Sequence, residues 1–562
     1  MPQHHRHSRS HRRSSAAVKR FLGVLGFVAI FLVAGGVYWL LKPAKVVSDN
    51  DLLGCLPSKA EVVVYQRSLE TDWLRLRTSN WFRVFMGRPE LKKFAQQHGF
   101  DKSELSDGER WILDLIGDRV LAGYVDDPQK PGRHNLFIFA PIGRRAKRLE
   151  MWADIIQRGG RAGFVMTSSR HGDAEVVRVT VKDWPEKLVV KYTKVRGIIV
   201  VAFSETEDTL ERHLDRGIPK ARGWNEKPKP LEGMAAEFQK EFGDRMGDES
   251  YRSQHGLWQR PNGLFAWTID TTNLGTIGIH THAPLAAPPP LNPTGLITSS
   301  GLLKQLPSNP MLTICGRLND WFAVVVAHAA CFDPATAQAV QRQMSRLRSS
   351  APWMGDHFAV ASLPWRPIAV HVPLPAPQWA LALECYNEKQ ARTGVQDGLQ
   401  QINGSTGLQF ALDSADVQGT LVDRLTSESK SLKNEIGYWP VMGFGENVLF
   451  AASSAELLLP MFREKPWREA NTDSNRLQWQ VAATTQAVRN TLSAYSLYRL
   501  INGSEPPGAL AMWLPRIDMA LDALAGLRSA SAAVKVENGA AFVSIEAVYE
   551  DLSPVATSLS NK

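Results

Sequence analysis

The sequence contains few cysteines, with four among 562 residues. They are Cys55, Cys315, Cys331 and Cys385, and they form neither a CxxC pair nor a Cys/His zinc pattern. Cys315 and Cys331 could pair in an oxidising compartment, but both lie in apolar sequence, which favours buried thiols. The scarcity of cysteine argues against a fold held together by a disulfide framework.

Established catalytic and nucleotide-binding motifs are also missing, including Walker A, HExxH, GxSxG and GxGxxG. The run 443–445 (Gly-Phe-Gly) lacks the third glycine of a dinucleotide-binding loop and precedes a predicted strand. Ser427 and Lys430 satisfy SxxK, but the companion SDN and KTG elements are absent, which favours a solvated helix or loop. We therefore assign no catalytic residue, no cofactor-binding residue and no metal ligand from the sequence.

Two patterns of ionisable residues have ordinary structural interpretations. His280 and His282 would point to the same side of a strand and could reach one metal ion, with Asp270 as a guessed third ligand. We favour instead the polar face of an edge strand. The recurring Gly-Asp pairs at 117–118 and 355–356 each precede a predicted strand, and this position predicts turns.

Only one uncharged apolar run is long enough to cross a bilayer, at residues 21–41. Its length matches the roughly 20 residues that a helix needs. Residues 1–20 carry six Lys or Arg and no Asp or Glu, which predicts a cytoplasmic tail. A cleaved signal peptide is the alternative, but its apolar core would span only about 7–15 residues. The sequence predicts a single-pass protein of the inner (plasma) membrane, with residues 42–562 extracytoplasmic.

The positive charge belongs mainly to that tail. It supplies six of the nine net positive charges, so the remaining chain is close to neutral. This distribution favours contact with anionic headgroups and argues against a nucleic-acid partner. The four histidines of the tail are interpreted as a polar flank. Leu52–Cys55 resembles a lipoprotein processing box, but charged residues separate it from the apolar run, so we reject that interpretation.

The chain also repeats itself. Residues 52–67 match residues 302–317 at a constant offset of 250, and Asp-Trp follows in both copies, at 72–73 and 320–321. Further matches continue in the same order, which indicates a tandem duplication. A proline-rich connection separates the copies. The predicted organisation is a basic tail (1–20), a transmembrane helix (21–41), ectodomain repeat 1 (50–282), a linker (283–298), ectodomain repeat 2 (299–550) and a C-terminal tail (551–562).

Each copy reads as short strands rich in β-branched residues, punctuated by helices and hairpin turns. This pattern predicts an α+β fold with mostly antiparallel sheets covered by helices. Among the 17 tryptophans, Trp73 and Trp321 recur at equivalent positions, as do Trp184 and Trp439. Recurrence favours structural anchors over a carbohydrate or ligand groove.

These elements together resemble a family of uncharacterised bacterial envelope proteins. The shared features are Leu-Pro-Ser before the first strand, Asp-Trp after it, Gly-Asp before a middle strand, and a late strand that ends in Ser204 or Ser453. The resemblance implies a membrane-anchored, duplicated protein outside the cytoplasm, and it carries over no catalytic residue. Without a catalytic constellation, the sequence favours non-enzymatic binding or scaffolding, with an envelope protein or a lipid as the expected partner. A lipid or hydrophobic-ligand carrier and an envelope-polymer hydrolase are the alternatives.

Overall fold

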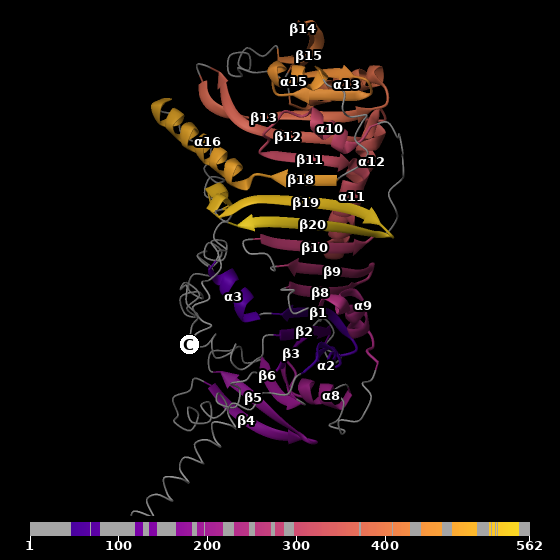
Figure 1. Cartoon of the computed structure of the whole chain (residues 1–562), viewed down its shortest axis with the longest axis vertical. Helices are drawn as coiled ribbons and strands as arrows, with labels where there is room; N and C mark the ends of the chain where they lie inside the picture. The colour runs from indigo at the N-terminus through magenta and orange to yellow at the C-terminus, as the bar shows by residue number, and fades with distance from the viewer. Residues whose placement is uncertain are drawn as a thin grey trace, which may run out of the picture. The chain divides into compact units, whose positions relative to one another are not determined.

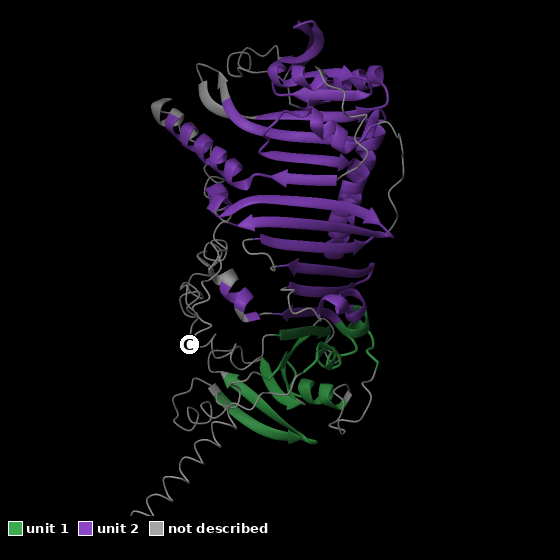
Figure 2. Cartoon of the chain, viewed as in Figure 1, with its two compact units in different colours: residues 1–60, 105–237 green, residues 61–104, 238–562 purple. Residues whose placement is uncertain are grey.

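The computed structural model describes residues 47–67, 69–78, 119–126, 134–142, 164–181, 188–195, 197–216, 230–246, 253–270, 276–285, 297–369, 372–406, 409–427, 440–463, 475–502, 516–518, 520–522, 524 and 526–549. The chain divides into two compact units, and both combine strands with helices (Figures 1 and 2). Unit 1 comprises residues 1–60 and 105–237, and unit 2 comprises residues 61–104 and 238–562. The segment 21–41 lies outside the described residues. Within the part of the chain that is described, no helix is both long and apolar enough to cross a membrane.

Unit 1 contains an antiparallel sheet, with one helix before its strands in the sequence and another after them. The strands pair in the order β2, β3, β7, β6, β5, β4. Their bounds are β2 Arg119–Asp126, β3 His134–Pro141, β4 Phe164–His171, β5 Ala174–Val181, β6 Val189–Val195 and β7 Ile198–Ser204. Helix α2 (Asp49–Leu53) begins with a capping box between Ser48 and Asp51 and buries two leucines. Helix α8 (Thr209–Arg216) follows β7 and packs on it.

Unit 2 is built on one continuous antiparallel sheet. Its strands pair in the order β1, β8, β9, β10, β20, β19, β18, β11, β12, β13, β17, β16, β15, β14. The strands from the first part of the chain are β1 Ala60–Arg67, β8 Ser253–Arg260, β9 Gly263–Asp270 and β10 Thr276–Pro284. The others are β11 Leu312–Arg317, β12 Met354–Ala369, β13 Val372–Cys385, β14 Phe410–Val417, β15 Thr420–Ser427, β16 Val441–Gly445, β17 Val448–Ala452, β18 Asn475–Trp479, β19 Leu527–Glu537 and β20 Ala540–Tyr549.

One strand pair joins the first part of this sheet to the second. Every residue of β10, from Thr276 to Pro284, is in register with a residue of β20. Figure 1 shows the two strands side by side, although about 260 residues separate them along the chain. Helix α11 (Leu318–Phe332) covers this pair, where Val324 and Ala327 pack with Ala283 and Ala541.

Helices cover both faces of the sheet further along unit 2. Ala359, Ala361, Ala380 and Ala382 face α10 (Ser299–Gln305) and α15 (Ala455–Arg463). The intervening residues, such as Leu383, face the opposite side, where α13 (Glu388–Thr406) packs. This alternation is the period of two expected of a strand, and the alanine face allows its helices to approach closely. The prediction of an α+β fold with mostly antiparallel sheet is therefore confirmed.

The remaining helices are α3 (Leu69–Thr78), α9 (Met234–Met246), α12 (Pro334–Ser350) and α16 (Val481–Asn502). Local sequence explains where α12 begins. Asp333 Oδ1 accepts a hydrogen bond from the backbone N–H of Ala335 at 3.0 Å, and Pro334 occupies the first helical position.

The alanine-faced core generates a test of the fold. Phe450 is fully buried, and its ring packs edge-on against Phe462 with centroids 5.1 Å apart. Replacing it (Phe450→Ala) should lower the free energy of unfolding by about 3–5 kcal/mol, because the lost ring leaves a cavity. Leu421→Ala is the control, since Leu421 is 63% exposed and its change should stay within about 0.5 kcal/mol. Equal losses in the two variants in guanidinium titrations would contradict this packing.

Candidate functional site

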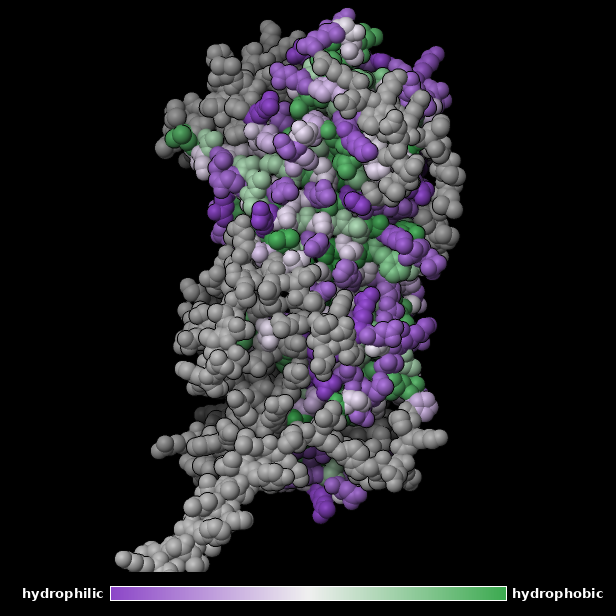
Figure 3. Space-filling view, viewed as in Figure 1, coloured by the Kyte–Doolittle hydropathy of each residue, from purple (hydrophilic) through white to green (hydrophobic). Residues whose placement is uncertain are grey.

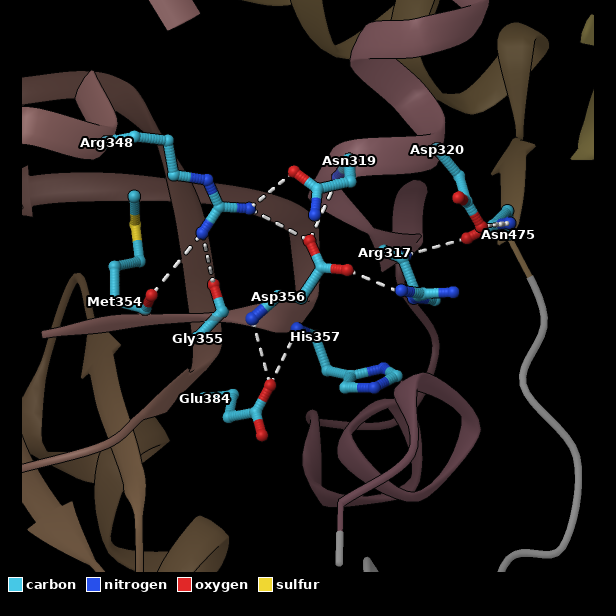
Figure 4. Close-up of polar contacts among 10 residues, drawn as sticks. All are labelled: Arg317, Asn319, Asp320, Arg348, Met354, Gly355, Asp356, His357, Glu384 and Asn475. Atoms are coloured by element: carbon cyan, nitrogen blue, oxygen red, sulfur yellow. Dashed lines mark hydrogen bonds and ion pairs between the residues drawn. The ribbon is translucent and has the colours of Figure 1, made fainter. Parts of the chain in front are cut away.

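A buried ionic cluster lies where β11, α11, α12 and β12 meet (Figure 4). At its centre, the side chain of Asp356 is only 2% exposed. Its Oδ2 accepts a hydrogen bond from Arg317 Nε at 3.0 Å, and its Oδ1 accepts one from Arg348 Nη2 at 2.9 Å. The same Oδ1 accepts the backbone N–H of Asn319 at 2.9 Å, in the first turn of α11. Because the first N–H groups of a helix lack intrahelical partners, Asp356 caps α11 from a distant strand.

A second carboxylate supports the first from the neighbouring strand. Glu384 of β13 accepts hydrogen bonds from the backbone N–H groups of Asp356 at 2.9 Å and His357 at 3.1 Å. Gly355 makes this approach possible, because a Cβ at that position would lie 2.4 Å from Glu384 Cγ. The interpretation of 355–356 as a turn is therefore wrong. Asp356 lies within β12, where two guanidinium groups compensate its buried charge.

Asn475 of β18 extends this cluster to the end of β11. Its Oδ1 accepts the backbone N–H of Arg317 at 2.7 Å, and its Nδ2 donates to Asp320 Oδ2 at 3.0 Å. Gly316 has a φ of 148° and lies so close that a Cβ would be 2.4 Å from Asn475 Oδ1. With these contacts the carboxylates bind strands to helices, so the cluster acts as a structural clamp.

Two histidines are held neutral in the interior of their units. In unit 2, His255 lies between the hydroxyls of Ser253, 2.6 Å from Nε2, and Thr268, 3.1 Å from Nδ1. Burial lowers its pKa to about 4, and the charge of Arg245 adds to this while Asp270 opposes it. In unit 1, burial lowers the pKa of His213 to about 4 despite a hydrogen bond to the carbonyl oxygen of Cys55.

A pocket of about 760 Å³ opens in unit 2 between α16 and the strands β11 and β18. This volume falls within the range typical of ligand sites. No charged side chain is among the lining residues of this pocket, all of which belong to the described part of unit 2. The lining residues are Asn309, Pro310, Met311, Thr313, Pro364, Trp365, Gln478, Gln480, Ala483, Gln486, Ala487 and Asn490.

Regular structure places these side chains. Thr313 and Gln478 are directly opposed on β11 and β18, so both project from one sheet face. The helical wall follows the spacing i, i+3, i+4, i+7 over residues 483–490 of α16. Trp365 lies at a bulge of β12, where the pairing with β13 shifts register between Leu363 and Arg366. A bulge re-aims side chains, and here it coincides with an aromatic ring that lines the pocket.

The histidine pair of β10 has separate partners. His280 Nδ1 lies 2.9 Å from Ser544 Oγ, whereas His282 Nδ1 lies 3.7 Å from Glu241 Oε1. Within the described residues, no group of three or more His, Cys, Asp or Glu is arranged to hold a metal ion. The interpretation of this segment as an edge strand is wrong, because β10 is paired on both sides, with β9 and β20.

The other residues considered from the sequence are dispersed. All four cysteines are buried free thiols. Ser427 ends β15, while Lys430 and Gly117–Asp118 lie outside the described residues. Trp321 Nε1 donates to the carbonyl oxygen of Cys315 at 3.2 Å, as expected of a structural anchor. Trp184 and Trp439 also lie outside the described residues, and Trp365, which lines the pocket, was not singled out from the sequence.

The chain matches no protein-family model, and no curated protein is significantly similar to it. Among solved structures, crystal form I of TP0453 aligns over 44% of this chain and 83% of that chain, with 14% sequence identity and a TM-score of 0.25. A likeness at that TM-score supports no inference about function.

The ionic clamp predicts a large effect for Asp356→Ala. Removing the carboxylate leaves two arginines without a counter-charge in a largely buried site and uncaps α11, so the free energy of unfolding should fall by about 3 kcal/mol. Asp397→Ala, at an exposed position of α13, should change it by less than about 0.5 kcal/mol. Chemical denaturation measures both variants, and a loss below about 1 kcal/mol for Asp356→Ala would refute the clamp.

The buried neutral state of His255 predicts a pH dependence. In the unfolded chain its pKa returns to about 6.5, so the unfolded state binds more protons between this value and about pH 4. The stability of unit 2 should therefore be complete above pH 6.5 and should decrease as the pH falls towards 4. His255→Gln should reduce that decrease when denaturation midpoints are measured at several pH values. An identical pH profile for the variant would show that His255 does not contribute.

Proposed function

We propose that this chain is a single-pass, membrane-anchored extracytoplasmic protein that binds or scaffolds other components of the cell envelope and does not transform a substrate. The anchor and its orientation rest on the apolar run 21–41 and the basic residues before it. The body of the protein would then present its sheet surfaces and the pocket of unit 2 outside the cytoplasm.

The chemistry of the pocket carries the binding role. Its polar lining consists of carboxamides and one hydroxyl, Thr313. Carboxamides donate and accept hydrogen bonds but do not exchange protons near neutral pH, whereas general acid–base catalysis depends on a titratable group beside the substrate. The buried carboxylates Asp356 and Glu384 are occupied in the clamp. The pocket is therefore better suited to holding a ligand than to converting one.

The strand connections support an internal duplication. Unit 1 pairs its strands as β2–β3–β7–β6–β5–β4, and unit 2 contains the corresponding order β12–β13–β17–β16–β15–β14. The meander β8–β9–β10 likewise corresponds to β18–β19–β20. We infer that two copies of one ancestral unit were retained to build a larger binding surface.

Lipid carriage is the second candidate and would require an apolar groove. Six of the twelve lining residues are polar, five carboxamides and one hydroxyl, and leaving these groups unpaired against an acyl chain would be costly. On the face of unit 2 visible in Figure 3, hydrophilic and hydrophobic residues are interspersed among the coloured atoms. These observations favour a polar ligand.

Cysteine labelling tests the proposed topology. Because all four native cysteines are buried, their reaction with a membrane-impermeant maleimide should be weak. Ser345→Cys, at an exposed position of α12, should be labelled in intact spheroplasts. Ser8→Cys, in the basic tail, should be labelled only after lysis.

Each outcome of this labelling has a defined meaning. Labelling of Ser345→Cys only after lysis would contradict the extracytoplasmic location. Failure to label Ser8→Cys under any condition would indicate that the tail has been removed, as with a cleaved signal peptide. Affinity capture with the full chain from solubilised membranes then tests binding, and repeated recovery of no envelope component would argue against the proposed role.

A further inference from the structure

We propose that the pocket between α16, β11 and β18 binds a neutral oligosaccharide, with Trp365 as the stacking surface and side-chain amides as the hydrogen-bonding groups. This inference deepens the proposed binding role and depends on it. It names the chemical class of the ligand at that site.

The amides match the chemistry of a sugar. Gln478 and Gln480 are exposed at the pocket, and within the described residues their side-chain amides have no hydrogen-bond partner in the protein. Gln486 Nε2 donates to Asn490 Oδ1 at 2.8 Å, and both residues are exposed, so the Gln486 carbonyl oxygen and the Asn490 amino group can bind a ligand. Each amide offers donors and an acceptor, and a sugar hydroxyl also both donates and accepts. A dense set of such groups suits a polyhydroxylated ligand.

The aromatic and apolar part of the lining suits the other surface of a sugar ring. Trp365 is half-buried and lines the pocket next to Pro364, while Met311 forms a buried part of the lining. A pyranose ring has an apolar C–H face, and a flat indole offers a large apolar area with few rotatable bonds. Burying that face against Trp365 would release water from apolar surface, as the hydrophobic effect requires.

The backbone makes an extended peptide a poorer ligand. Peptides are commonly bound by addition to an open sheet edge, where main-chain groups are free. Here β11 is paired with β12 and β18, and β18 is paired with β11 and β19. Their main-chain groups face neighbouring strands, so β11 and β18 can contact a ligand only through side chains.

The absence of charge from the lining argues against an ionic ligand. Phosphate and carboxylate groups are usually bound by arginine, which forms two parallel hydrogen bonds with them. The nearby Arg489 of α16 forms an ion pair with Asp522 at 2.7 Å and is not part of the pocket wall. A neutral glycan fits these side chains better than an acidic one.

Binding to defined sugars tests the proposal. We would titrate the full chain, purified in a detergent without a sugar headgroup, with maltoheptaose, cellohexaose and chitotetraose by calorimetry and saturation-transfer NMR. The wild-type chain should bind at least one of them. Trp365→Ala and Gln486→Ala should each weaken binding, with a loss of at least about tenfold for Trp365→Ala. Gln341→Ala, which removes an exposed helical glutamine from α12, is the matched control and should leave the affinity unchanged.

The remaining outcomes are decisive. If Trp365→Ala does not fold, the titrations use Trp365→Phe and the surface variant Gln486→Ala in its place. Absence of binding to all three sugars at millimolar concentration would overturn the proposal, as would binding that these pocket variants do not affect. Preferential binding of tetragalacturonate or a decaproline peptide would also overturn it. Cysteine labelling tests the topology and affinity capture tests the binding role, and both are independent of these titrations. A failed sugar-binding test therefore leaves the proposed anchored binding role standing.

Discussion

The antiparallel pairing of β10 with β20 determines how unit 2 is built. It extends over every residue of β10 and joins strands from the two parts of the chain, so neither strand is left as an open edge that could pair with another molecule. The long connection between them must be closed for this pairing to form, which is entropically unfavourable. Helix α11 offsets part of that cost by packing small and branched residues across the two strands. His328 on the same helix shares a hydrogen bond with Thr281 at 2.9 Å.

The ionic clamp around Asp356 lies at the beginning of that same helix. Arg317 ends β11, Asn319 opens α11 and Arg348 lies in the last turns of α12, so one carboxylate fixes three elements at once. Burying an ion pair does not by itself guarantee stability, but removal of one partner leaves an uncompensated charge. Helix α11 thus connects the clamp to the pair β10–β20. The pocket lies on β11 and β18, which belong to the same sheet.

Local sequence patterns were sufficient to predict the class of fold but not to predict which buried polar groups contact one another. Alternating β-branched segments and two-residue turns identify strands, because these signals lie within a few residues of one another. The two arginine partners of Asp356 lie 39 and 8 residues away along the chain, with no fixed spacing that could reveal them. The sequence did not reveal the pocket either, since a bulge directs Trp365 there and the lining comes from three distant segments, 309–313, 364–365 and 478–490. Among the lining residues, only those of α16 follow a local sequence pattern, the spacing i, i+3, i+4, i+7 that places side chains on one face of a helix.

The four cysteines have a consequence for biogenesis. Burial and the carboxylates of Glu388 and Glu384 raise the pKa of Cys385 to about 11, and burial also raises the pKa of Cys331. Only the thiolate attacks a disulfide or reacts with an oxidant, so these groups are almost inert at neutral pH. The native state therefore holds four buried thiols and no disulfide, and an oxidant would reach these thiols chiefly in chains that have unfolded.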